Sequence, residues 1–164
     1  MLSRESSATL MNAVTAFIYR EARLQDEHQY EDWEKLWTED GVYWVPANGV
    51  DIDPEKEMSI IYDNRSRIAL RVRQLMTGKH FTQTPQSRLR RLVSNIELMD
   101  EQATGDIAVA SNSLIFESSL RDDTLWAARN EYRLRYVDGE LRMVYKKVML
   151  VNNDKALFTL SFLV

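Results

Sequence analysis

The stretch that decides the fold is residues 124–137, TLWAARNEYRLRYV, in which residue character alternates at every second position. One set comprises Trp126, Ala128, Asn130, Tyr132, Leu134 and Tyr136, and the other comprises Arg129, Glu131, Arg133 and Arg135. Successive side chains of a strand point to opposite faces of its sheet, so this period predicts a strand with one buried face. We therefore expect a long β-strand whose mainly apolar set faces a core.

Three further segments around this stretch also have strand character. They are SRLRRLVSNIELMD at 87–100, DIAVASNSLIFESSL at 106–120 and ELRMVYKKVMLVN at 140–152. Turn-forming residues separate the four segments, in EQATGD, RDD and VDGE. The second half of the chain is therefore predicted to be four long antiparallel strands in series.

The first half of the chain has helical spacing instead. A first helix is predicted from the stripe of Leu10, Ala13, Val14, Phe17, Ile18 and Leu24, with Ser6 or Ser7 as its cap. A second is predicted from Asp26, as N-cap, to Trp37, and a third from Asn64 to Met76, stopped by Gly78. Short extended segments are expected at GVYWVPA, residues 41–47, and MSIIYDN, residues 58–64.

Helices followed by a strand meander predict an α+β fold. We expect one domain over residues 1–164, since this length suffices for a single core. Long antiparallel strands with only three helices must curl to enclose that core. The expected shape is a cone-like, strongly curved antiparallel sheet packed on the three helices, and a cone can either hold a ligand pocket or be filled by side chains.

Composition excludes several functions. The chain has no cysteine, which rules out disulfides, thiolate nucleophiles and any iron–sulfur cluster held by this chain alone. No run of eighteen apolar residues occurs, and the N-terminus lacks a secretory pattern. We therefore expect a cytoplasmic protein without a membrane span.

Charge is distributed unevenly along the chain. Residues 26–57 contain eleven acids and two lysines, whereas residues 64–92 contain eight arginines and lysines and no acid. The two segments can pair within the fold, or they can form surfaces that meet complementary neighbouring subunits. A nucleic-acid surface is the least supported of the alternatives, because the basic segment lacks interleaved aromatic residues.

A metal site is suggested by DEHQYED, residues 26–32, because His28 and Asp32 are spaced to share one helical face. With His80, they would supply two histidines and a carboxylate, the ligand set of a mononuclear iron centre. The acids have a simpler explanation, since carboxylates are favoured in the first turn of a helix. We favour that explanation and expect no metal ligands in this chain.

Evidence for catalysis by this chain is sparse. No nucleophile elbow and no glycine-rich phosphate loop occurs. Acid–base chemistry inside a cone pocket would most plausibly involve Tyr132 and Asn130, which lie on the apolar face of the predicted strand. The alternative is that Tyr132 is a core residue with its hydroxyl at the edge.

Four stretches are informative when taken together. They are FIYREARLQDEHQYEDWEKLWTEDGVYWVP at 17–46, NRSRIALRVRQLMTG at 64–78, SRLRRLVSNIEL at 87–98 and LFTLSFLV at 157–164. As an ordered set they resemble one family, the small (beta) subunits of Rieske-type aromatic-ring-hydroxylating dioxygenases. The resemblance extends from about Phe17 to Val164, and length and tail are most similar to the benzoate-type branch. The chain departs from many relatives at Arg91, where they have a histidine, so one packing or interface contact is left open.

The resemblance implies a cystatin-like fold, as in nuclear-transport factor and scytalone dehydratase. It implies a non-catalytic structural subunit, in an oxidoreductase for aromatic compound catabolism, that assembles with an alpha subunit as three alpha and three beta chains. The alpha subunit would carry the [2Fe-2S] Rieske cluster and the mononuclear Fe(II), and this chain no cofactor. Residue counts agree, because both centres together require two cysteines and at least four histidines, and the chain has no cysteine and two histidines.

As a subunit, the chain is expected to make beta–beta trimer contacts and a contact with the alpha subunit. Interfaces favour aromatic residues and arginine. The predicted interface residues are Trp33, Trp37, Tyr43, Trp44, Arg65, Arg88, Arg90 and Arg91. The alternative is a stand-alone cone-fold dehydratase or isomerase of a small hydrophobic substrate, which would require an open pocket inside the cone.

Overall fold

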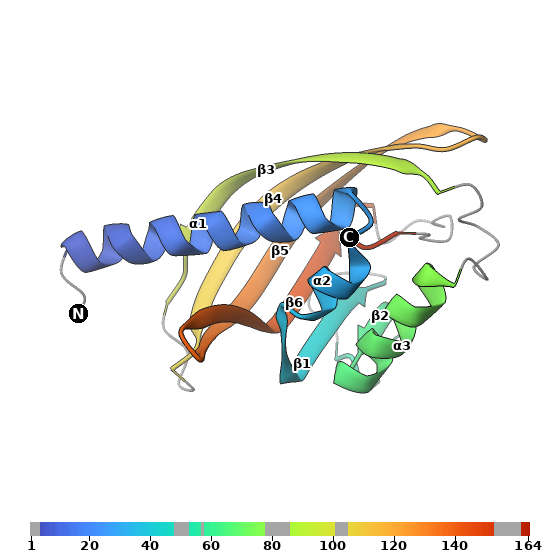
Figure 1. Ribbon diagram of the computed structural model, residues 1–164. Coiled ribbons are helices and arrows are strands. Elements are labelled where there is room, and N and C mark those ends of the chain that lie inside the picture. Colours follow the sequence, from blue (N-terminus) through green and yellow to red (C-terminus); the bar gives the residue numbers. More distant parts are fainter. Residues whose placement is uncertain (1–3, 48–52, 57, 78–85, 101–104, 153–161) are drawn as a thin grey trace.

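The computed structural model describes residues 4–47, 53–56, 58–77, 86–100, 105–152 and 162–164. Three helices and six strands lie in this part of the chain (Figure 1). Their bounds are α1 Arg4–Asp26, α2 Tyr30–Glu34, β1 Trp37–Pro46, β2 Ser59–Asp63, α3 Arg65–Met76, β3 Arg88–Leu98, β4 Ile107–Ser118, β5 Asp123–Val137 and β6 Glu140–Leu150. Within the described residues, no helix is both long enough and apolar enough to span a bilayer.

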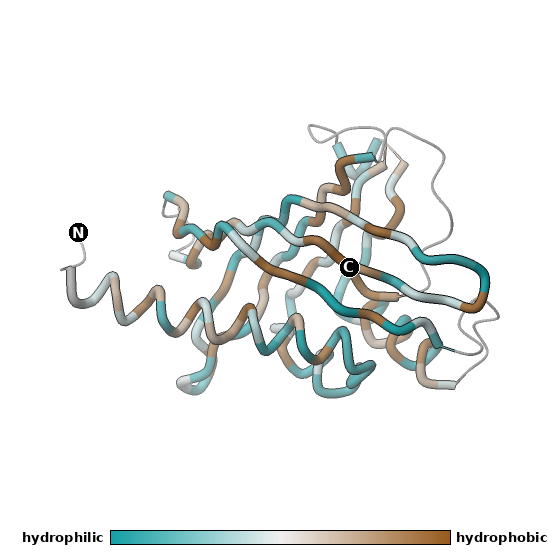
Figure 2. Tube along the Cα trace, turned by 90° about the horizontal axis from the view of Figure 1, so that it is seen from above, coloured by the Kyte–Doolittle hydropathy of each residue, from teal (hydrophilic) through white to brown (hydrophobic). Residues whose placement is uncertain are grey.

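The six strands form one sheet in the order β2-β1-β6-β5-β4-β3. Helix α1 crosses one face of this curved sheet, and α3 lies beside β1 and β2 (Figure 1). Seen from above, α1 runs along one side of the strands (Figure 2). The α+β fold with a strongly curved sheet is therefore confirmed, and the four predicted long strands are β3 to β6.

One pair of strands departs from the predicted antiparallel sheet. β1 and β6 are parallel, whereas the other neighbours are antiparallel. These two strands are far apart in sequence, so no hairpin turn constrains their direction. Local spacing therefore predicts the hairpins but not the pairing of the first strand with the last.

Strand β5 shows the alternation expected from its sequence. Its buried positions are Trp126, Ala128, Asn130, Tyr132 and Leu134. Tyr136 belongs to the same set by spacing but is 52% exposed, because it lies next to the β5–β6 turn, at the end of the sheet. That turn has Asp138 at φ 51° and Gly139 at φ 80°, so the predicted turn at VDGE is confirmed.

The sheet bends where strand pairing slips. The β3–β4 register shifts between Ser94 and Glu97, and Asn95 in this gap has a positive φ of 56°. A second shift occurs between Arg133 and Leu134 in the β5–β6 pair. Such bulges bend a strand and increase its twist, which explains how these strands curl over α1.

The helix predicted from Asp26 to Trp37 has the wrong bounds. Asp26 ends α1, His28 follows with a positive φ of 56°, and Trp37 begins β1. The apolar spacing is misleading here because a short helix and the strand after it both face the core. The predicted cap of the first helix is also wrong, since Ser6 and Ser7 lie inside α1.

Helix α3 follows its prediction closely. It begins after Asn64, whose side-chain oxygen accepts a hydrogen bond from the Arg67 amide at 3.0 Å. Its buried residues are Ile68, Val72 and Leu75, which belong to one core cluster with the inner face of the sheet. This shared core holds α3 against β1.

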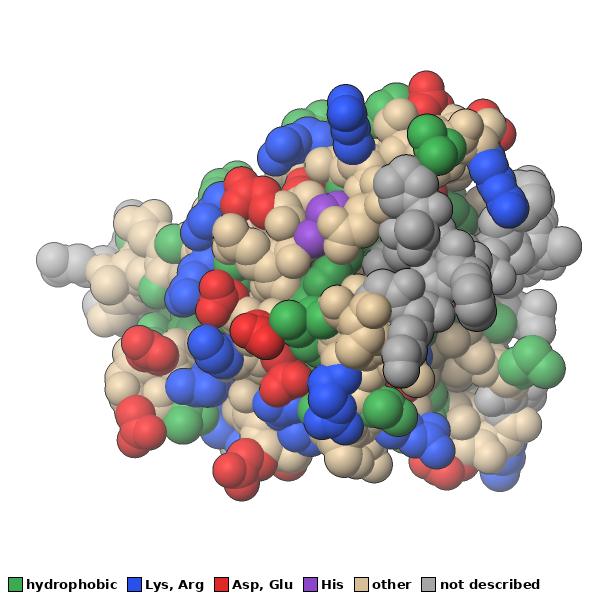
Figure 3. Space-filling view, turned by 45° about the vertical axis from the view of Figure 1, so that its right-hand side comes forward, with side chains coloured by type: hydrophobic (Ala, Val, Ile, Leu, Met, Phe, Trp, Pro, Cys, Tyr) green, Lys and Arg blue, Asp and Glu red, His purple; other side chains and the backbone are tan. Residues whose placement is uncertain are grey.

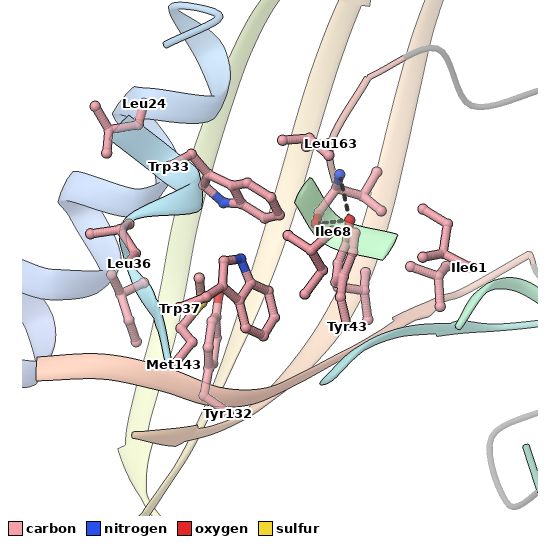
Figure 4. Packing of buried hydrophobic residues seen from close by; sticks show 14 of the residues in the cluster. Leu24, Trp33, Leu36, Trp37, Tyr43, Ile61, Ile68, Tyr132, Met143 and Leu163 are labelled. Atoms are coloured by element: carbon pink, nitrogen blue, oxygen red, sulfur yellow. Dashed lines mark hydrogen bonds between the residues drawn. The ribbon is translucent and has the colours of Figure 1, made fainter. Parts of the chain in front are cut away.

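Aromatic residues occupy the centre of the core. The rings of Trp33, Trp37 and Tyr43 lie 5.6 to 5.9 Å apart between centroids, at steep angles (Figure 4). Leu163 comes from the other end of the chain and packs in the same cluster. Residues 162–164 are 1–3% exposed, so this end of the chain is part of the core.

Candidate functional site

A buried ion pair lies inside the cone. Glu21 of α1 accepts a hydrogen bond from the Lys146 ammonium of β6, with Nζ and Oε2 2.7 Å apart and both side chains 2% exposed. The same Oε2 accepts from Trp33 Nε1 at 2.8 Å, and Oε1 accepts from the Tyr132 hydroxyl at 2.9 Å. Three donors thus satisfy the carboxylate, as a buried charge requires.

The buried environment changes the ionisation of this cluster. Burial raises the pKa of Tyr132 well above its usual value, and the nearby Glu21 carboxylate raises it further. Burial lowers the pKa of Lys146, although Glu21 opposes this shift. A tyrosine whose pKa is raised holds its proton more tightly, so Tyr132 acts here as a hydrogen-bond donor rather than as a base.

Sequence analysis missed both members of the ion pair. Glu21 lies four residues after Phe17 and three before Leu24, on the apolar stripe of α1. Lys146 precedes Val148 and Leu150 at the alternate positions of β6 that are buried. The sequence pattern that could have revealed the pair is therefore one acidic residue, Glu21, and one basic residue, Lys146, each at a position whose spacing predicts burial.

The space left inside the cone is too small for a substrate. A cavity of about 10 Å³ lies among Glu21, Gln25, Tyr132, Lys146 and Val164. That volume is about one water-sized probe, so it cannot admit an organic molecule. An enzyme acting on a substrate inside this cone would need an open pocket, and the described side chains fill the interior around Glu21 and Lys146.

The two polar residues singled out on β5 have structural partners. The Tyr132 hydroxyl binds Glu21 near the centre of the core, not at its edge. Asn130 donates from Nδ2 to the hydroxyls of Ser111 and Ser113, each at 3.2 Å. These bonds join β4 to β5 and α1 to the sheet.

A second buried network is centred on Arg91 of β3. Its Nε lies 2.6 Å from Oδ1 of Asp26, and its backbone amide donates to Oδ2 of the same residue at 2.9 Å. The guanidinium also donates to Gln25 Oε1 at 2.8 Å and to the Leu163 carbonyl at 3.0 Å. The Arg91 and Asp26 side chains are 3% and 4% exposed. Arg91 therefore links α1, β3 and residues 162–164.

Tyr43 fixes the same end of the chain. Its hydroxyl donates to the main-chain oxygen of Val164 at 2.7 Å and accepts from the Val164 amide at 3.1 Å (Figure 4). Gln25 donates to the same oxygen at 3.3 Å. Phe162 packs edge-on against Trp126, with ring centroids 5.9 Å apart. These contacts close the cone from within the chain.

The residues of the possible metal set do not converge. His28 lies 2.8 Å from the Ser87 carbonyl oxygen through Nε2 and 2.5 Å from the Tyr30 hydroxyl through Nδ1. Asp32 pairs with Lys35 on the exposed side of α2. His80 lies outside the described residues. In the part of the chain that is described, no group of three or more His, Cys, Asp or Glu residues is placed to hold a metal.

The comparisons with known proteins agree with this closed, cone-like fold. The family model "Ring hydroxylating beta subunit" matches residues 20–154. The chain belongs to this family. The small oxygenase component of a p-cumate 2,3-dioxygenase system, from Pseudomonas putida, is 35% identical over 84% of this chain and 77% of the relative.

Other relatives of this beta subunit include the benzoate-type branch, as the resemblance predicts. A toluate 1,2-dioxygenase subunit beta from Pseudomonas putida is 30% identical over 87% of this chain and 90% of the relative. The crystal structure of a benzoate 1,2-dioxygenase beta subunit from Burkholderia mallei superposes with a TM-score of 0.71. It is 23% identical and covers 85% of this chain and 89% of the other, which supports the fold.

Three of the four predicted interface aromatics of this beta subunit, Trp33, Trp37 and Tyr43, belong to its own core cluster. Trp33, Trp37, Tyr43 and Trp44 are 0–6% exposed. Aromatic composition could not separate core from interface, because both environments favour large rings. The first three are 0–2% exposed. Trp44 is outside the core cluster, and the Lys147 ammonium lies over its ring, 4.5 Å from the ring centroid.

The predicted interface arginines fall into two groups. Arg65 pairs with Glu34 at 3.0 Å and Arg91 pairs with Asp26, so both are used within the chain. Arg88 and Arg90 are exposed on β3. Acidic and basic side chains are interspersed on the face seen in Figure 3, as expected where many pair within the fold. Arg88 and Arg90 are thus the two that remain available to a partner.

The raised pKa of Tyr132 predicts that the folded chain loses stability at alkaline pH. Because its pKa is raised above 10.0, the folded chain keeps a proton that the unfolded chain releases. The contribution of the Tyr132 phenol to the free energy of unfolding is fully present below pH 10. It is lost as the pH rises toward the pKa that Tyr132 has in the folded chain. Lys146 has the opposite effect on the pH dependence of stability. Burial lowers its pKa below 10.5, so its contribution to the free energy of unfolding increases as the pH rises. Urea denaturation between about pH 8 and 11 should therefore show a shallower loss of unfolding free energy for Tyr132→Phe than for wild type.

The exposed Tyr136 offers the matched control for this experiment. Tyr136→Phe should leave the pH dependence unchanged. Equal slopes for wild type and both variants would show that the Tyr132 phenol does not couple folding to pH.

Proposed function

We propose that this chain is the non-catalytic structural subunit of a multicomponent aromatic-ring-hydroxylating dioxygenase that acts in aromatic compound catabolism in the cytoplasm. Beta subunits of these dioxygenases partner with alpha subunits. In our proposal three copies of this chain support three alpha subunits, which carry the Rieske cluster and the mononuclear iron. Substrate choice then belongs mainly to the alpha subunit.

The filled cone is the observation that carries this proposal. The Glu21–Lys146 pair, the aromatic cluster and residues 162–164 occupy the interior where a cone-fold enzyme would bind its substrate. The chain also lacks the ligands for the redox centres, because it has no cysteine and two histidines. A subunit of this kind contributes through its surface, by binding the large subunit and keeping it assembled.

Co-expression with a large oxygenase subunit from the native host tests the proposal. A tag on the large subunit should retain this chain through affinity and size-exclusion steps, and the large subunit expressed alone should lose soluble yield and oxygenase activity. An unrelated cone-fold protein of similar size serves as the control that should not be retained. A chain that never co-purifies with any co-expressed large subunit would contradict the proposal.

A further inference from the structure

One side chain on the inner face of the sheet is left partly uncovered. Tyr136 follows Tyr132 and Leu134 at alternate positions of β5, on the face that packs against α1, yet it is 52% exposed. It lies next to the β5–β6 turn, which is beside α1 (Figure 1). A hollow of about 520 Å³, here called the turn hollow, lies between α1 and this turn, and Tyr136 is among its lining residues. Small-molecule pockets have volumes of about 300–1,000 Å³.

The floor of the turn hollow is apolar. Phe17 and Leu36 line it and are themselves buried, at 8% and 5% exposed, so they present the outer side of the core. Leu141 also lines it and packs against the core cluster. Ala13 and Ala16 of α1 have short side chains, which leave the space beside the helix open. An apolar group of a ligand therefore finds apolar contacts on this floor.

Positive charge surrounds this apolar floor. Arg20 of α1, Lys35 between α2 and β1, and Arg142 of β6 all line the turn hollow. Among its described lining residues, Glu140 is the only acid, so three cations and one carboxylate give the turn hollow a net charge of +2. The whole chain carries −4. A cluster of positive charge on an acidic protein favours an anionic ligand at that place.

The chain itself makes little use of these three cations. Arg20 takes part in no ion pair within the described residues. Lys35 pairs with Asp32 at 3.3 Å, but both side chains are more than half exposed, so the pair contributes little. Arg142 donates from Nη1 to the Lys35 carbonyl at 2.8 Å, and its Nη2 is 3.9 Å from Glu140. Arg142 is therefore held in place and keeps donor capacity for a carboxylate.

We propose that the turn hollow binds a small aromatic carboxylate. The ring of the ligand packs on the apolar floor beside Phe17 and Tyr136, and its carboxylate accepts hydrogen bonds from the surrounding cations. An aromatic ring suits the site because rings pack against one another and against guanidinium groups. Inorganic phosphate would leave the floor unfilled, and a neutral aromatic compound would leave the cations without an anion.

A ligand in the turn hollow connects three segments that are far apart in sequence. Arg20 belongs to α1, Lys35 precedes β1 and Arg142 belongs to β6. Because unfolding separates these segments, the ligand binds the folded chain alone and stabilises it. The turn hollow lies outside the filled interior of the cone, and it requires no redox centre. This site therefore does not rest on the proposed function.

Titration calorimetry of the full chain with benzoate tests this site. Benzoate should bind with a dissociation constant on the order of 1 mM or tighter. Benzamide has the ring without the charge and inorganic phosphate has the charge without the ring, so each should bind about 10-fold or more weakly. The double variant Arg20→Gln, Lys35→Gln should weaken benzoate by about 10-fold. Ala16→Trp fills the turn hollow from an exposed position and should abolish measurable binding.

Arg23→Gln provides the matched control, because Arg23 is an exposed arginine of the same helix that does not line the turn hollow. It should bind benzoate like wild type, and circular dichroism should show all variants folded. Benzoate that binds no more tightly than benzamide or phosphate would overturn the proposed ligand class. Benzoate binding that Ala16→Trp and the double variant leave unchanged would place the ligand elsewhere and overturn the site. Retention on a tagged large subunit is a separate readout, so either proposal can fail without the other.

Discussion

Replacing Glu21 by leucine should lower the free energy of unfolding by about 3–5 kcal/mol. The substitution leaves the Lys146 ammonium buried without its carboxylate, and it removes the acceptor of Trp33 Nε1 and the Tyr132 hydroxyl. Burial already lowers the pKa of Lys146, so the variant should recover stability as the pH rises and Lys146 loses its proton. Urea denaturation at two pH values measures both effects.

The double variant Glu21→Leu, Lys146→Met provides the control for this prediction. It removes both charges and keeps the interior volume filled, so it should be less destabilised than Glu21→Leu alone. The unpaired Trp33 and Tyr132 donors should keep it below wild type. Additive losses from the two single variants would show that the ion pair does not act as a unit.

Replacing Arg91 by methionine should cost about 3–5 kcal/mol of unfolding free energy. Methionine fills similar space but leaves the buried Asp26 carboxylate without its guanidinium, and it removes the donors to Gln25 and Leu163. Arg91→Lys should restore part of the loss, because it returns the charge without the planar fork that reaches three partners. Denaturant unfolding of the purified chain measures each value.

The neighbouring residue supplies a control for Arg91. Arg90 is exposed on the other side of the same strand, so Arg90→Met should change stability by no more than about 0.5 kcal/mol. The two substitutions delete the same group one residue apart. Similar losses at both positions would show that the buried network around Asp26 has no special role in folding.

The long strands could be predicted from sequence because their periodicity is local. The alternation from Trp126 to Leu134 directly reports which side of β5 is buried. The same reasoning failed between Asp26 and Trp37, where a reversal at His28 and a five-residue helix interrupt one apolar spacing. The pairing of β1 with β6 also escaped prediction, because contacts so far apart in sequence leave no local pattern.

The functional conclusions divide in the same way. The absence of cysteine and the count of two histidines could be read from composition, and in the proposed function the redox centres belong to another chain. Arg91 and Arg90 are adjacent in the same strand, yet one is buried and one is exposed. Arg91 is buried because the packing of β3 against α1 places it beside Asp26. The sequence around a single arginine does not reveal how the strand packs on the helix.

Iron and acid-labile sulfide measured on the purified complex and on this chain alone give the most direct test of the account. We predict that both elements accompany the large subunit in the complex and that the isolated, folded chain binds neither. Stoichiometric iron on the isolated chain would contradict the account, because it would place a redox centre in the subunit that we assign to assembly.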